Sequence, residues 1–149
     1  MLVEAQLPVA GTRAAVWAAI ADIEGAARII SGIKQIEIVE RPASGLVGLR
    51  WRETRILFGE PATVEKWVTA ASENEYYTTR AEEKGFAFLT TMRITEGAGG
   101  VTVVSSHDSQ PQTFSARLQA VFMGLFFKGV IRKAILQDLG DIKAAVEGR

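Results

Sequence analysis

The sequence predicts an α+β fold in which a curved seven-stranded antiparallel sheet wraps around one long C-terminal helix, with two short helices after the first strand. The segments between residues 33 and 109 alternate apolar and polar side chains and are separated by short turn sequences. Residues 112–146 instead repeat apolar side chains at intervals of three and four. Because the turns between strands are too short for crossover connections, neighbouring strands are expected to run antiparallel.

Composition limits the classes of partner. A chain of 149 residues is expected to fold as a single domain over residues 1–149. Lys and Arg together number 17, as do Asp and Glu, so no overall field attracts nucleic acid or anionic lipid. A local basic patch would escape this count. Nucleic-acid binding is therefore not expected.

Two further features of the sequence bear on the cellular compartment of the protein. The first residues lack the basic start and long apolar core of a signal peptide, and the apolar run at 121–131 contains Lys128 and is too short to cross a bilayer. The absence of cysteine excludes disulfides and cysteine-based zinc sites. These features predict a cytoplasmic protein without integral membrane association.

The expected elements follow in order. Residues 1–9 form a strand, Thr12 caps a helix that ends at Ala21, and residues 24–30 form a second helix. Further strands are expected at residues 33–40, 46–57, 62–70, 75–83, 86–94 and 101–109. In the fifth strand Tyr77, Thr79 and Ala81 are placed inward, because the charged residues between them then face water.

The register of the last two strands follows from the Gly97–Gly100 turn. The simplest pairing puts Val103, Ser105 and His107 opposite Ile94, Met92 and Thr90. The inward faces of strands 46–57 and 62–70 are not determined by their patterns.

Several short sequence signatures occur in a characteristic order along these predicted elements. They are Val16-Trp17, Asp22-Ile23-Glu24 before Gly32-Ile33, Val47-Gly48 with Trp51 and Glu53, Gly100-Val101-Thr102, and Leu139, Ile142 and Lys143. In this order they resemble the START-like superfamily, also called SRPBCC or the polyketide cyclase/dehydrase group, over essentially the whole chain. The resemblance implies a helix-grip fold.

The resemblance also implies a range of functions. Members carry lipids, sterols, plant hormones or quinones, others cyclise or dehydrate polyketides, and some oxygenases use the fold in their catalytic domain. An iron centre of the oxygenase type is set aside, because a two-His-one-carboxylate site needs more than the one histidine present. No cofactor and no metal are expected.

Two groups are candidates for acid–base chemistry. His107 is either a general base, a ligand contact, or a structural histidine bonded to Ser105, Thr90 or a backbone carbonyl. Glu53 lies on the same strand face as Trp51 and Arg55, and an inward face would make the Glu53–Arg55 pair an informative buried site. An outward face would make it an ordinary surface pair.

The expected ligand site combines both kinds of side chain. The apolar wall is expected from Phe86, Phe88, Met92, Phe114, Leu118 and Phe122. Orienting polar groups are expected from Trp51, Arg55, Tyr77, Thr90 and His107.

The first half of the C-terminal helix is irregular. Lys128 and Arg132 lie close to the apolar stripe, so either they reach into the cavity or the helix bends near Gly124 and Gly129, which the glycines favour. Phe122 and its aromatic neighbours give this part several apolar faces, which predicts burial against a cavity wall or a second subunit.

Three functions remain open from the sequence. The first is binding or transport of a small hydrophobic or amphipathic ligand, lipid-like or polyketide-like, in a cavity between sheet and helix. The second is a cyclase or dehydratase that uses His107 or Glu53 as acid and base. The third is an interaction module whose apolar helix face binds a partner or a second copy, giving a homodimer.

Overall fold

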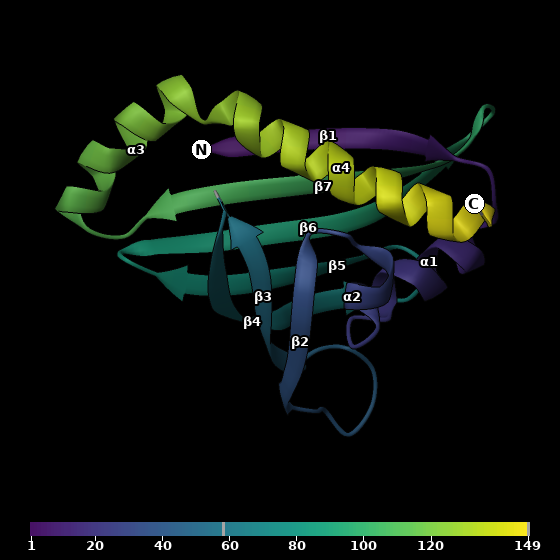
Figure 1. Ribbon diagram of the computed structural model, residues 1–149. Coiled ribbons are helices and arrows are strands. Elements are labelled where there is room, and N and C mark those ends of the chain that lie inside the picture. The colour runs from purple at the N-terminus through teal and green to yellow at the C-terminus, as the bar shows by residue number, and fades with distance from the viewer. Residues whose placement is uncertain (58, 149) are drawn as a thin grey trace.

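The computed structural model describes residues 1–57 and 59–148. The elements follow the order predicted from sequence, except that the C-terminal helix is divided (Figure 1). Their bounds are β1 (Leu2–Val9), α1 (Arg13–Ala21), α2 (Ala26–Ile29), β2 (Ile33–Glu40), β3 (Arg50–Leu57), β4 (Glu60–Ser72), β5 (Tyr76–Glu83), β6 (Phe86–Gly97), β7 (Gly100–Pro111), α3 (Phe114–Phe126) and α4 (Lys128–Glu147).

The seven strands form one antiparallel sheet in the order β1-β7-β6-β5-β4-β3-β2. The sheet is curved, so that β2 and β3 run at a steep angle to β1, β6 and β7 (Figure 1). The predicted β6–β7 register is confirmed, with Met92 opposite Ser105 and Thr90 opposite His107. The α+β class and the helix-grip arrangement are therefore confirmed.

The β5–β6 hairpin shows how the local sequence fixes the sheet. Lys84 and Gly85 form its two-residue turn, with φ of 51° and 81°. Positive φ at both positions gives the turn the twist that suits antiparallel strands. A side chain at Gly85 would also meet Thr113 Oγ1 at 2.8 Å, so this turn fits closely against the start of α3.

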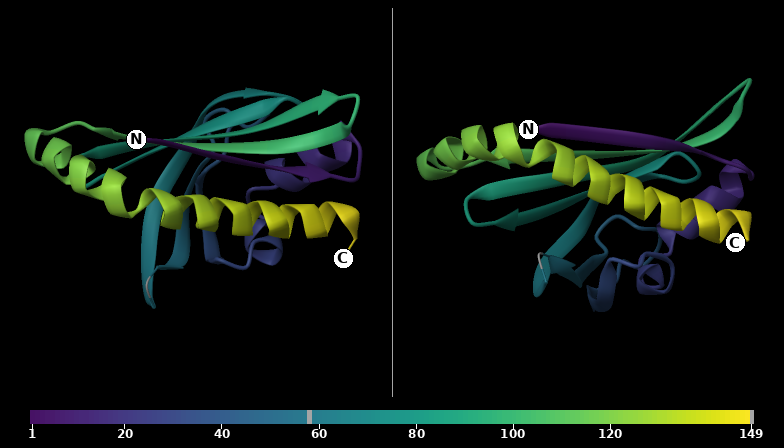
Figure 2. Two further views of the ribbon diagram at one scale, coloured as in Figure 1. Left: turned by 90° about the horizontal axis from the view of Figure 1, so that it is seen from above. Right: turned by 45° about the horizontal axis from the view of Figure 1, so that its top comes forward.

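Helix α4 covers the concave face of the sheet (Figure 2). Its buried residues Ile135, Leu139 and Ile142 belong to the main core cluster, together with residues of α1, β1, β6 and β7. Their spacing of three and four places them on one helix face. The predicted covering role is therefore correct for α4.

The C-terminal helix is not continuous. Helix α3 ends at Phe126, α4 begins at Lys128, and segments 114–124 and 128–147 meet at 78°. The bend lies between Gly124 and Gly129, as the glycines predicted. It turns Lys128 and Arg132 to the outside, where Arg132 Nη1 donates to the Glu4 carbonyl oxygen at 2.9 Å.

The bend also changes the role of α3. Among the described side chains of this helix only Ala116 is buried, at 1% exposure, whereas Phe114, Leu118 and Phe122 are exposed. The expectation that this stretch covers the sheet is therefore wrong. The physical reason is the break at Phe127, where α3 and α4 diverge (Figures 1 and 2).

Within residues 1–57 and 59–148, no single helix has the length and apolarity needed to cross a membrane. The bent pair of segments 114–124 and 128–147 meets that test by length and composition only.

Candidate functional site

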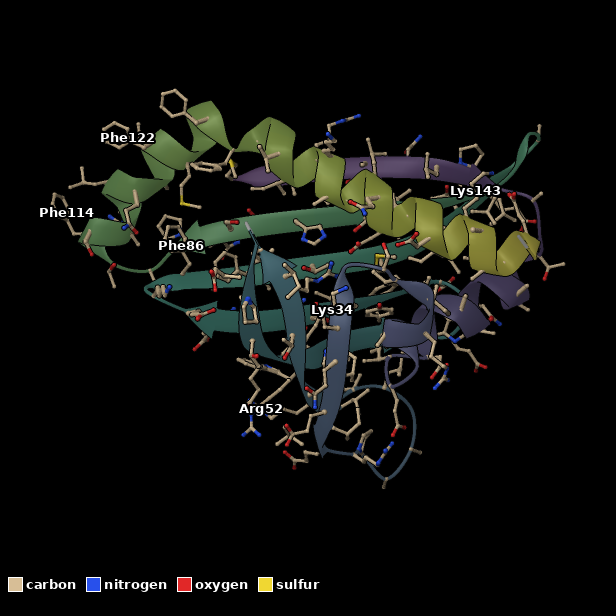
Figure 3. All side chains as sticks on the ribbon, viewed as in Figure 1. Lys34, Arg52, Phe86, Phe114, Phe122 and Lys143 are labelled. Carbon is tan, nitrogen blue, oxygen red and sulfur yellow. The ribbon has the colours of Figure 1, made fainter. Side chains whose placement is uncertain are left out.

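A partly open space lies between the concave face of β3–β7, the α1–α2 segment and α4, and we call it the α4–sheet cavity. Its volume is about 90 Å³. Apolar side chains line most of it, chiefly Ile20, Ile23, Ile29, Ile30, Ile33, Trp51, Met92, Leu139 and Ile142. The polar lining comes from Glu53, Arg55, Lys66, Tyr77, Thr79, Thr90, Ser105, His107 and Asp138. Figure 3 shows the side chains that fill the space between α4 and the sheet.

A chain of ion pairs connects the sheet to α4 at one side of this cavity. The Glu53 carboxylate accepts from Arg55 Nε at 2.8 Å, from Lys66 Nζ at 3.0 Å and from Trp51 Nε1 at 3.3 Å. Arg55 also donates both terminal nitrogens to the Asp138 carboxylate, at 3.2 and 2.8 Å. Strand β3 thus faces inward at Trp51, Glu53 and Arg55, which settles the face that the sequence left open.

Burial and pairing act against each other on Glu53. Burial favours the neutral acid, but the nearby Lys66 and Arg55 charges and their hydrogen bonds outweigh it and lower the Glu53 pKa to about 2. Burial likewise opposes the charge of Arg55, but its bonds to Asp138 and Glu53 raise its pKa above the ordinary value. Glu53 is therefore an ionised, fully engaged carboxylate and a weak base.

Hydroxyl groups form a second polar feature, across β5, β6 and β7. Thr79 pairs with Thr90 and Thr90 with His107, so these three side chains form one row across the sheet. Tyr77, Met92 and Ser105 form the adjacent inward row. Side chains directly opposite each other on neighbouring strands lie about 5 Å apart, so the two rows make a continuous patch.

Most of this patch has no hydrogen-bond partner in the part of the chain that the structure describes. Among the described residues, the hydroxyls of Tyr77, Thr79 and Ser105 make no hydrogen bond to the protein. Because no fully buried polar side-chain atom of those residues lacks a partner, these hydroxyl oxygens are accessible from the cavity, although Thr79 and Ser105 are only 5% and 3% exposed. The one contact in the patch is a 3.4 Å approach of Thr90 Oγ1 to His107 Nδ1. These groups face the cavity, where each can form a hydrogen bond with water or with a ligand.

The two titratable members of the patch are neutral near pH 7. Burial, with the Lys66 and Arg55 charges, lowers the pKa of His107 to about 4 against a small opposing effect of Glu53. Burial and the Glu53 charge raise the pKa of Tyr77 above its ordinary value. His107 is therefore a neutral imidazole and Tyr77 a neutral phenol, and each can donate or accept a hydrogen bond.

The structure brings together part of the predicted site. Trp51, Glu53, Arg55, Tyr77, Thr90, Met92 and His107 line the cavity. Phe86 and Phe88 do not line it; they lie at the end of β6 next to the β5–β6 turn and stack on each other with ring centroids 5.8 Å apart. Phe114, Leu118 and Phe122 lie on α3 and are 76%, 56% and 66% exposed. They are outside the cavity because the bend directs α3 away from α4.

Sequence reasoning missed several lining residues. Lys66 was missed because the inward face of β4 was undetermined, and Ser105 was considered only as a partner for His107. Thr79 was placed inward without a role. Asp138 carried a usable signal, since it adjoins Leu139 on the stripe that also contains Ile135 and Ile142. In the part of the chain that the structure describes, no group of three His, Cys, Asp or Glu side chains is arranged to hold a metal ion.

A seven-stranded antiparallel sheet that grips a long C-terminal helix over a cavity defines the START-like class of helix-grip proteins. Within that class, the chain belongs to the family described as polyketide cyclase / dehydrase and lipid transport, which it matches over residues 2–147. The predicted resemblance is confirmed. No protein with curated function matches the sequence.

Solved structures support the fold at low sequence identity. The protein TTHA0849 from Thermus thermophilus has a TM-score of 0.80 at 15% identity, covering 99% of this chain and 98% of its own. The Zhui aromatase/cyclase from Streptomyces sp. R1128 has a TM-score of 0.78 at 18% identity, covering 99% and 93%. A major latex-like protein from Panax ginseng has a TM-score of 0.78 at 14% identity, covering 97% and 96%.

Proposed function

We propose that the protein binds a small amphipathic molecule in the α4–sheet cavity. The apolar part of the ligand contacts the isoleucines of α1, α2 and α4 together with Met92. Its polar part bonds to the hydroxyl patch of Tyr77, Thr79 and Ser105. An apolar pocket with a few converging polar groups is the usual form of a small-molecule site.

The unpaired hydroxyls carry this proposal. Leaving a buried polar group without a hydrogen bond costs about 1–3 kcal/mol. Among the described residues no fully buried polar side-chain atom lacks a partner, so these three hydroxyls open onto the cavity, where water or a bound molecule can pair with them. A ligand oxygen that replaces water there gains both the hydrogen bonds and the contact with the apolar wall.

The size of the cavity restricts the ligand. Pockets for drug-sized molecules span roughly 300–1,000 Å³, whereas this cavity measures about 90 Å³. A compact ligand, such as a single substituted ring or a short branched chain, fits the space without rearrangement. A lipid-sized or multi-ring ligand requires α2 or α4 to move away from the sheet.

A cyclase or dehydratase is the second candidate, because His107 lines the cavity within reach of a bound substrate. With a pKa lowered to about 4 its imidazole is unprotonated at pH 7 but is a weak base, which makes catalysis the less favoured of the two functions. Glu53 is the poorer choice, because three donors already hold its carboxylate. His107→Gln distinguishes the two functions, since it removes proton transfer while it keeps a hydrogen-bonding side chain.

The test measures binding of a library of small phenols, hydroxylated rings and short fatty acids by thermal shift and native mass spectrometry. The double variant T79V/S105A keeps shape and removes two hydroxyls, and we expect it to weaken binding of a hit at least tenfold, about 1.4 kcal/mol. The control T54V removes a hydroxyl that bonds to Thr63 on the exposed face and should bind normally. The proposal fails if no compound binds, or if T79V/S105A binds every hit as tightly as the unmodified protein.

A further inference from the structure

Helix α3 presents its large apolar side chains to solvent. We call the set formed by Phe114, Leu118, Val121, Phe122, Phe126, Phe127 and Val130 the α3 apolar face. Their exposed fractions run from 41% at Phe127 to 76% at Phe114. In Figure 3 the labelled Phe114 and Phe122 point away from the sheet.

This exposure is concentrated in one place. Among the described residues, the other exposed large apolar side chains are scattered over the chain, at Leu2, Val39, Val47, Ile56 and Leu57. Single exposed apolar residues are normal on any surface, but a contiguous patch marks an interaction site. The helix packs on its own protein through Ala116 and turns Phe114, Leu118 and Val121 outward, the reverse of an ordinary covering helix.

The charged residues of the segment that carries this face have a single sign. From Gln112 to Gln137 the sequence contains Arg117, Lys128, Arg132 and Lys133 and no acidic residue, although the whole chain is neutral. Within residues 1–57 and 59–148, Arg117, Lys128 and Lys133 form no ion pair, so their charges are uncompensated. On adjoining strands Glu4 pairs with Arg93 and Glu82 with Arg80, which leaves Glu83 as the unpaired acid of the β5–β6 hairpin.

We propose that the α3 apolar face docks on the surface of an anionic lipid bilayer. The thirteen residues of α3 make a helix about 20 Å long, which suits a position parallel to the membrane plane. The phenylalanines enter the boundary between headgroups and acyl chains, and the cations contact lipid phosphates. Aromatic and aliphatic residues on one face with basic residues beside them are the features of interfacial helices.

Charge decides between the bilayer and a second copy of the chain. A two-fold dimer places the same patch of both subunits together, so α3-to-α3 contact would bring two sets of unpaired cations face to face. An anionic lipid surface instead neutralises them. The proposal does not depend on the ligand in the α4–sheet cavity, because the α3 apolar face lies outside that cavity.

The experiment is flotation of the full-length protein with vesicles of phosphatidylcholine alone or mixed with phosphatidylglycerol. We expect binding to the mixed vesicles that weakens as salt is raised. Each cation near an anionic surface strengthens binding about fivefold, so K128A/K133A should bind about 25-fold more weakly, and F122S/F126S should reduce binding more than tenfold. The controls V39S/V47S and K34A change exposed residues elsewhere and should bind normally.

Three results would overturn the proposal. One is the absence of binding to mixed vesicles, and another is equal binding to neutral and mixed vesicles. The third is a dimer detected by light scattering that F122S/F126S converts to monomer, which would assign the face to a second copy. Since Phe122 and Phe126 are 66% and 71% exposed, unchanged thermal unfolding of F122S/F126S verifies that its loss of binding is not a loss of folding.

Discussion

Replacing Glu53 with Gln tests the ion-pair chain directly. The carboxylate has a pKa of about 2 in the folded protein and 4.5 as the reference value. A shift of one pKa unit corresponds to about 1.4 kcal/mol, so the ionised form contributes on the order of 3 kcal/mol to stability at pH 7. We expect E53Q to lower the free energy of unfolding by about that amount.

The pH dependence gives the sharper test. Because the folded pKa is depressed, the contribution is complete above pH 4.5 and is lost as the pH falls toward 2. The difference between the unmodified protein and E53Q should therefore shrink from about 3 kcal/mol at pH 7 to about 1 kcal/mol at pH 3. Other carboxylates titrate in both proteins, so their effects cancel in the difference.

Urea denaturation across pH 3–7 measures both quantities. The matched control is E37Q, which removes an exposed carboxylate that pairs with Arg52 at 3.3 Å and should change stability by less than about 0.5 kcal/mol. A constant difference between E53Q and the unmodified protein over this pH range would refute the reasoning, as would a loss below about 1 kcal/mol at pH 7.

Two further predictions concern His107 and Gly85. Because burial and nearby cations lower its pKa to about 4, His107 should remain neutral from pH 7 to pH 5 in an NMR titration, and a midpoint near 6.5 would contradict the buried placement. Gly85→Ala should destabilise the protein by more than about 1 kcal/mol in chemical denaturation, since φ is +81° and the new methyl would meet Thr113 Oγ1 at 2.8 Å. The control Gly97→Ala adds a methyl to open space at a position without positive φ, and an equal loss in both variants would show that the hairpin conformation is not the cause.

Local patterns were sufficient for most of the fold. Alternation along β5 placed Thr79 and Ala81 inward, and both are buried. The β6–β7 register followed from a short glycine turn, which predicts that Thr90 and His107 lie opposite each other. These features depend on residues close in sequence, and their physical causes are the two-residue strand period and turn geometry.

The residues that make up the site were harder to predict from the sequence than the fold was. Asp138 reaches Arg55 across 83 positions of sequence, and this pairing exists only because α4 lies over β3. Lys66 lies on the neighbouring strand β4, diagonally across from Glu53, and its part in the network depended on the inward face of β4, which the sequence left open. No local pattern encodes the Arg55–Asp138 contact, since it depends on how two distant elements are placed.

The two halves of the C-terminal segment show which features the local sequence predicts and which depend on tertiary packing. Periodicity and glycine positions are enough to predict a helical segment beside an antiparallel sheet, interrupted in its first half. The role of each half depends on packing, since Ile135, Leu139 and Ile142 are buried against the sheet, whereas the large apolar residues Phe114, Phe122 and Phe126 face solvent. A hydrophobic stripe specifies that one face of a helix avoids water, but the direction of that face depends on the 78° bend and on what the rest of the chain leaves uncovered.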